Sequence, residues 1–210
     1  IGTGIALDRF TPVDRLEARA RLGLPANAPV IVGVGGLVER KGFHRLIALL
    51  PSLEERVPGV QLLIVGGGTT QEDMSGRLRA LASELGVERA VHFCGPQPPE
   101  GLRWFYGAAD VFALATAHEG WANVFLEAMA CGLPVVTTRV GGNAEVVASE
   151  SVGTLVPFWE PDACVDALVD ALVRDWNRTA IRQYAEQHSW DARIRILKRE
   201  FAALASAAPE

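Results

Sequence analysis

The sequence predicts an α/β protein with a Rossmann-like, doubly wound parallel sheet of about six strands and helices on both faces. Three features support this fold class. Short apolar runs alternate with helical patterns, glycine-bearing loops follow three of these runs, and residues 111–138 have the pattern strand, loop, helix and strand, with Gly132 ending the helix. Strands that are separated by helices pair in parallel through right-handed crossovers.

The individual elements follow from apolar spacing and from turn residues. A short charged helix at residues 13–22 precedes the first strand. The predicted strands are residues 30–34, 61–65, 90–93, 111–114, 134–138 and 153–156. The helices between them are residues 43–56, 71–85, 101–106 and 122–130. Beyond Pro161 the chain becomes helical, with segments at 162–174, 178–187 and 190–204.

Composition excludes several classes of function. The chain has 210 residues, of which 49% are hydrophobic, and this is ample for a packed core. The net charge is −5 and the basic residues form no stripe with aromatics, so nucleic acid is not an expected partner. No apolar run approaches the roughly 18–20 residues that span a bilayer, and no signal-peptide pattern is present. Cys94, Cys131 and Cys164 lie in apolar surroundings without a metal-binding spacing, so we expect reduced thiols in a cytoplasmic protein and no metal.

Three glycine loops follow predicted strands, at residues 33–36, 66–68 and 141–142. Glycine allows backbone amides to approach a ligand, and the helix behind such a loop offers unpaired N–H groups, so the loops suit a phosphate or diphosphate. A purely structural role is the alternative for each loop, since any fold of this class needs such turns. None matches the dinucleotide fingerprint or the phosphate loop of nucleotide triphosphatases.

Lys41, with Arg40 beside it, lies at the start of the helix after the first glycine loop. A cation there faces the same crevice as the loop amides. Charge-assisted contacts to phosphate oxygens are strong, and a cation that meets charge developing on a leaving diphosphate lowers the reaction barrier. A solvated lysine at a helix end is the alternative interpretation.

Glu119 and Glu127 are separated by seven residues, with Glu119 just before the helix at 122–130 and Glu127 inside it. Carboxylates accept hydrogen bonds from vicinal hydroxyls, so the pair suits a sugar at one end, a ribose at the other, and phosphates between them. Glu127 lies in an apolar stretch and therefore needs a partner. Trp121 is a candidate for stacking on a base or sugar, although such a residue more often belongs to the core.

The chain resembles the C-terminal donor-binding half of retaining GT-B glycosyltransferases of family 4 over nearly its whole length. The resemblance is carried by Glu119-Gly120-Trp121, by Glu127-Ala128-Met129-Ala130, by residues 132–136 and 141–145, and by the loop at 36–42. It implies that residues 1–210 form a single nucleotide-sugar-binding domain. The last predicted helix has apolar residues with no sheet left to cover, so we expect residues 188–210 to form a terminal helix that packs on a missing N-terminal domain.

The resemblance implies roles for individual residues. Glu119 would contact donor-sugar hydroxyls and Lys41 the diphosphate, and these two are the expected catalytic residues. Glu127 would hold the ribose. The other donor-binding residues that it implies are Gly36, Arg40, Gly95, Pro96, Gln97, Gly120, Trp121, Asn123 and Val124. The chain departs from the family at Gly36, where an arginine is common, so diphosphate binding is expected to be weaker unless Arg40 substitutes.

The implied enzyme transfers a hexose, with retention of configuration, from a UDP-, GDP- or ADP-sugar to a glycan or lipid-linked acceptor. It needs no cofactor, and the acceptor binds through the N-terminal domain, without which this chain is expected to be inactive. The expected location is cytoplasmic, with the whole enzyme peripheral at the inner membrane face. A non-catalytic nucleotide-sugar-binding module and a GT-B phosphorylase or epimerase remain as alternatives.

Overall fold

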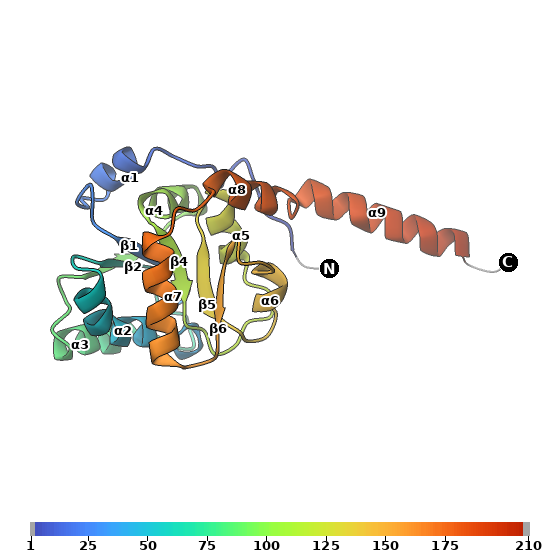
Figure 1. Cartoon of the computed structure of the whole chain (residues 1–210). Helices are drawn as coiled ribbons and strands as arrows, with labels where there is room; N and C mark the ends of the chain where they lie inside the picture. The colour runs from blue at the N-terminus through green and yellow to red at the C-terminus, as the bar shows by residue number, and fades with distance from the viewer. Residues whose placement is uncertain (1–2, 208–210) are drawn as a thin grey trace.

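The computed structural model describes residues 3–207 and contains a six-stranded parallel sheet with the strand order β3-β2-β1-β4-β5-β6 (Figure 1). All five strand pairs are parallel. The strands are β1 Val30–Val34, β2 Gln61–Val65, β3 Val91–Gly95, β4 Val111–Leu114, β5 Val135–Thr138 and β6 Gly153–Val156. The order reverses between β1 and β4, which is the signature of a doubly wound sheet. The predicted fold class is confirmed.

The central strands form the core because they are covered on both faces. Every residue of β1, β4 and β5 is buried, whereas the edge strand β3 is buried only at Val91. Parallel strands that are buried on both faces are continuously apolar, and this property made them recognisable in the sequence.

Apart from α6, the helices lie in the predicted regions, and together they cover both faces of the sheet (Figure 1). They are α1 Arg15–Arg21, α2 Phe43–Arg56, α3 Ser75–Glu84, α4 Leu102–Ala108, α5 Asn123–Ala130, α6 Asn143–Val146, α7 Pro161–Val173, α8 Arg178–Glu186 and α9 Trp190–Ala207. Two short 3-10 turns, η1 Glu39–Lys41 and η2 Pro99–Gly101, precede α2 and α4.

One predicted helix begins later than expected, and one helix was not predicted. The helix predicted from residue 71 begins at Ser75, because the Asp73 carboxylate accepts the backbone N–H and the hydroxyl of Ser75 and forms a turn instead. The helix α6 was missed, since two glycines precede it. Buried Asn143 holds it to the end of β5 by donating Nδ2–H to the Thr138 carbonyl at 2.8 Å.

The helix α9 extends away from the rest of the molecule (Figure 1). Its exposed side chains include Trp190, Ile194 and Phe201, and Phe201 is 66% exposed. Ile5 holds the start of α9, because its carbonyl accepts the Trp190 N–H at 3.3 Å and its N–H donates to the His188 carbonyl at 3.0 Å.

Candidate functional site

Loops from the first three strands meet at the carboxyl edge of the sheet. Gly35 donates its N–H to Val65, Gly66 donates to Gly95, and the three strand ends are thereby joined. A Cβ atom at Gly66 would lie 1.9 Å from the Gly35 carbonyl oxygen, so only glycine fits. The glycine loops after β1 and β2 therefore have a packing role in addition to any ligand that they bind.

Lys41 and Glu119, which are distant in sequence, form an ion pair at this edge. Lys41 Nζ lies 2.5 Å from Glu119 Oε1, and the two side chains are only 12% and 8% exposed. Arg40 Nη1 lies 3.6 Å from the same oxygen. A buried ion pair is costly to desolvate, and an anionic ligand offers the lysine an alternative partner. The structure thus brings three of the four predicted charged residues, Arg40, Lys41 and Glu119, together.

The backbone around Glu119 is held in place by its neighbours. Thr116 donates its hydroxyl to the Arg40 carbonyl at 2.9 Å, which joins the lysine-bearing turn to the end of β4. Gly141 has a φ of 47°, and a Cβ there would lie 1.9 Å from the Glu119 carbonyl oxygen. Gly142 donates its N–H to that oxygen at 3.0 Å. The predicted glycine loop at 141–142 therefore supports the glutamate-bearing segment.

Glu127 lies in α5 and is partly buried. The Tyr106 hydroxyl donates to Glu127 Oε2 at 2.8 Å. Burial raises the pKa of the Glu127 carboxyl, while the Tyr106 hydrogen bond and the charge of Arg9 oppose the rise. The sequence showed that Glu127 needs a partner but did not identify Tyr106. The available signal was a tyrosine in an apolar segment, because a buried phenol requires an acceptor.

The N-terminus of α5 lies between the two glutamates in sequence. This eight-residue helix begins after Ala122 without any side-chain cap, so the first amides, including those of Asn123 and Val124, have no capping partner. The Asn123 side chain is exposed and accepts a hydrogen bond from the Thr3 hydroxyl through Oδ1. An uncapped helix N-terminus with its partial positive charge is suited to an anion.

Trp121 occupies the loop that leads into α5 and is partly buried. The Arg193 guanidinium carbon lies 5.3 Å from the centroid of the Trp121 ring. Trp121 Nε1 and Arg193 Nε are both buried and lack a protein partner among the described residues. In the structure Trp121 therefore stacks with Arg193 in the first part of α9. The sequence did not predict this contact.

The predicted base-binding loop lies beside the other glycine loops. Gly95 has a φ of 67°, and Gln97 folds back to donate Nε2–H to the Cys94 carbonyl at 2.8 Å. Pro96 lies against Gly67, 3.5 Å from the position of a Cβ there. A Cβ at Gly36 would lie 3.2 Å from the Thr69 side chain, so a larger residue at that position needs Thr69 to move.

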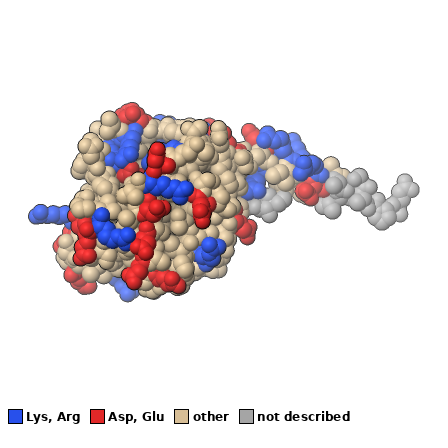
Figure 2. All heavy atoms as spheres, viewed as in Figure 1, with Lys and Arg blue, Asp and Glu red and all other residues tan. Residues whose placement is uncertain are grey.

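Within residues 3–207, no group of three or more His, Cys, Asp and Glu side chains is arranged to hold a metal ion. No helix in this described part of the chain is long and apolar enough to cross a bilayer. On the face in Figure 2, acidic and basic side chains are interspersed.

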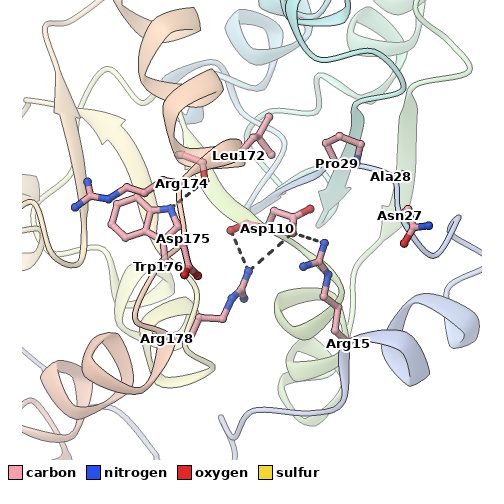
Figure 3. A pocket seen from close by; sticks show the side chains of 11 residues that line it. Arg15, Asn27, Ala28, Pro29, Asp110, Leu172, Arg174, Asp175, Trp176 and Arg178 are labelled. Carbon is pink, nitrogen blue, oxygen red and sulfur yellow. Dashed lines mark hydrogen bonds and ion pairs between the residues drawn. The ribbon is translucent and has the colours of Figure 1, made fainter.

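A polar cavity of about 320 Å³ lies at the opposite, amino edge of the sheet (Figure 3). Asp110, directly before β4, points into it between two arginines. Arg15 Nη2 lies 2.6 Å from Asp110 Oδ1, and Arg178 Nη2 lies 3.9 Å from it. Arg19, which is almost fully buried, donates to Asp110 Oδ2 at 2.9 Å. This cluster joins α1 and α8 to the sheet and does not include any predicted site residue.

Comparison with known proteins shows which family the chain resembles. The family model described as glycosyl transferases group 1 matches residues 14–188. A D-inositol 3-phosphate glycosyltransferase of Corynebacterium urealyticum is 42% identical over 198 residues, which cover 90% of this chain and 47% of that protein. The GDP-mannose-dependent alpha-(1-6)-phosphatidylinositol monomannoside mannosyltransferase of Mycolicibacterium smegmatis is 40% identical over 205 residues, with coverages of 91% and 52%.

The chain spans about half the length of these curated relatives. Among solved structures, sucrose-phosphate synthase from Thermosynechococcus elongatus superposes with a TM-score of 0.84 at 32% identity, over 99% of this chain and 53% of that one. The family match includes the whole sheet, the Lys41 turn and both glutamates. The chain belongs to the group 1 glycosyl transferases.

Proposed function

We propose that the chain is the donor-binding half of a retaining glycosyltransferase that moves a hexose from a nucleotide diphosphate sugar to a glycan or lipid-linked acceptor. The observation that carries the proposal is the buried contact between Lys41 and Glu119 beside the segment that leads into α5. This contact gives one small region a cation for phosphate and a carboxylate for sugar hydroxyls. Glu127, in the same helix, supplies a second carboxylate.

In this proposal the diphosphate binds to Lys41 and to the first amides of α5, at Asn123 and Val124. The Lys41 ammonium then stabilises the charge that develops on the leaving diphosphate, which lowers the barrier and not merely the dissociation constant. Arg40 Nη1 lies 3.6 Å from Glu119 Oε1, close to the ion pair. Arg40 thereby replaces the positive charge of the arginine that is common in the family at the position of Gly36.

The remaining roles follow from position. When Lys41 turns to phosphate, Glu119 is released to accept hydrogen bonds from hydroxyls of the donor sugar, beside the backbone of Gly120. Glu127 accepts from the ribose while Tyr106 holds its other side. The loop of Gly95, Pro96 and Gln97 borders the base. Trp121, whose ring is stacked by Arg193, shapes the wall between the sugar and α9.

The identities of the donor and the acceptor are proposed for the whole protein. The mannosyltransferase relative is named as GDP-mannose-dependent, which supports GDP as the first nucleotide to test, with UDP and ADP beside it. The names of the relatives refer to an inositol phosphate and a phosphatidylinositol mannoside, which support a phosphorylated or lipid-linked acceptor. The whole enzyme then acts in the cytoplasm, peripheral to the inner membrane face, without a cofactor.

The acceptor binds to an N-terminal domain in this proposal, and residues 188–210 pack on that domain, although 208–210 lie outside the described residues. The exposed side chains of Ile194 and Phe201 support a partner for α9. Adding the N-terminal half should slow hydrogen exchange in α9. Unchanged exchange there would count against the packing but not against donor binding.

Calorimetric titration of UDP, GDP and ADP into the chain tests the donor site. At least one nucleotide should bind, and Lys41→Ala and Glu127→Ala should abolish binding. The matched controls are Lys198→Ala, at the only other lysine of the sequence, and Glu84→Ala in α3, both of which are exposed and should leave binding unchanged. Absence of binding by all three nucleotides would refute the proposal.

Assays of the whole protein separate the alternatives. A non-catalytic module binds the nucleotide sugar without turnover, whereas a transferase forms a glycosylated product. Product analysis with inorganic phosphate as the acceptor reveals a phosphorylase, and analysis without any acceptor reveals an epimerase.

A further inference from the structure

Two adjacent aromatic residues, Phe158 and Trp159, are exposed in the loop between β6 and α7. Phe158 is 45% exposed and Trp159 is 36% exposed. The loop follows the carboxyl end of β6, so the pair lies at the same edge of the sheet as Lys41 and Glu119. Large apolar side chains next to a binding crevice are a common feature of ligand recognition.

The backbone at Trp159 is strained. Its φ of 52° lies in the left-handed region. No other non-glycine residue in the described part of the chain has a positive φ. Such a conformation is unfavourable for a bulky side chain, and strained residues concentrate at functional sites. Glycine would adopt the same backbone conformation at no steric cost.

Arg45, in the first turn of α2, contacts both rings. Its guanidinium carbon lies 5.0 Å from the Phe158 ring centroid and 5.7 Å from that of Trp159. The same guanidinium donates to the Ala115 carbonyl at 3.0 Å. Ala115 directly precedes Thr116, whose hydroxyl is 3.4 Å from Glu119 Oε1. A short chain of contacts therefore joins the aromatic pair to the carboxylate of the donor site.

We propose that Phe158 and Trp159 form a stacking platform for a pyranose ring of the acceptor, facing the N-terminal domain that binds the rest of the acceptor. This inference rests on the proposed function, since it places the acceptor sugar beside the donor sugar that Glu119 holds. The C–H face of a pyranose is apolar and packs on aromatic rings, while its hydroxyls at the ring edge remain free for polar partners. Arg45 fixes the two rings, which reduces the entropy that is lost on binding.

The charge of the loop favours a sugar over a lipid surface. Glu160 directly follows the aromatic pair, Asp162 lies two residues further on, and both are exposed. Carboxylates accept hydrogen bonds from sugar hydroxyls, whereas acids at an anionic bilayer are repelled by its negative potential.

Saturation-transfer NMR on the chain, with GDP or UDP present to fill the donor site, tests the platform. The probe is methyl α-D-mannopyranoside, and D-mannitol, which has similar hydroxyls but no ring face, is the negative control. Transfer to the ring C–H protons is expected for the pyranoside alone. It should fall about tenfold, the loss of ~1.4 kcal/mol, in Trp159→Gly and in Phe158→Ala. Trp159→Gly keeps the positive φ without strain and therefore keeps the loop folded.

Phe201→Ala, at an exposed aromatic on α9, is the matched control and should leave the transfer unchanged. In the whole enzyme, Trp159→Gly should raise the acceptor KM about tenfold and leave the donor KM unchanged. Equal transfer in the variants and the wild type would overturn the platform, provided that GDP or UDP still binds. If no nucleotide binds, the proposed function itself is wrong. Sedimentation with phosphatidylglycerol vesicles that is lost in the Phe158 and Trp159 variants would also overturn the platform, because it would show that the pair binds a membrane surface and not a sugar.

Discussion

Removing the Asp110 carboxylate should destabilise the chain more than removing any exposed acid. Asp110 accepts the buried Arg19 guanidinium at 2.9 Å, the Val30 N–H at 2.9 Å and Arg15 at 2.6 Å. Asp110→Ala leaves the Arg19 charge, on a side chain that is 1% exposed, without its counter-ion. Breaking a buried pair in this way costs about 3–5 kcal/mol of the free energy of unfolding, which is a large part of ~5–15 kcal/mol.

Urea unfolding followed by circular dichroism measures this loss, and the melting temperature should fall by roughly 6–20 °C for a domain of this size. The matched control is Asp166→Ala, which removes the partner of Arg56 at 2.5 Å from a pair that is 46% and 69% exposed. That change should cost less than about 1 kcal/mol. If Asp110→Ala also costs less than ~1 kcal/mol, the assignment of Asp110 as the tie between α1, α8 and the sheet is wrong.

Three further predictions concern the site and its surroundings. Because burial raises the pKa of Glu127 above the ordinary 4.5, the folded state binds its proton more tightly. Stability should therefore fall as pH rises from 4.5 through the raised pKa, and urea unfolding of Glu127→Gln should lack this component. Burial raises the pKa of the Cys94 thiol to about 11 and that of Cys131 to about 12, so thiol labelling at pH 8 should be slow until urea is added; rapid native labelling would contradict the burial. Gly141→Ala should weaken nucleotide binding in calorimetry, since its Cβ would lie 1.9 Å from the Glu119 carbonyl oxygen, and unchanged affinity would show that the supporting loop can move.

The sheet could be predicted because each central strand is marked by its own short run of apolar residues. The residues of β1, β4 and β5 are buried throughout, and burial on both faces of the sheet is what requires their nearly continuous apolar sequence. The starts of α3 and α6 were not predictable, since they depend on side-chain hydrogen bonds of Asp73 and Asn143 that override helical spacing.

The site was predictable in part for a similar reason. Lys41 and Glu119 each follow a strand, and the carboxyl ends of parallel strands meet at one edge, so their contact follows from topology. The Tyr106 partner of Glu127 and the three arginines around Asp110 depend on how helices pack across long sequence separations. Local pattern carries no signal for such contacts, and the family resemblance did not supply them either.

A crystal structure of the chain with GDP, or with whichever nucleotide binds in calorimetry, tests the central claim most directly. The diphosphate should lie within about 3 Å of Lys41 Nζ and of the Asn123 and Val124 amides, with the Lys41–Glu119 contact opened and a ribose hydroxyl on Glu127. A nucleotide bound elsewhere, with the contact between Lys41 and Glu119 intact, would contradict the account.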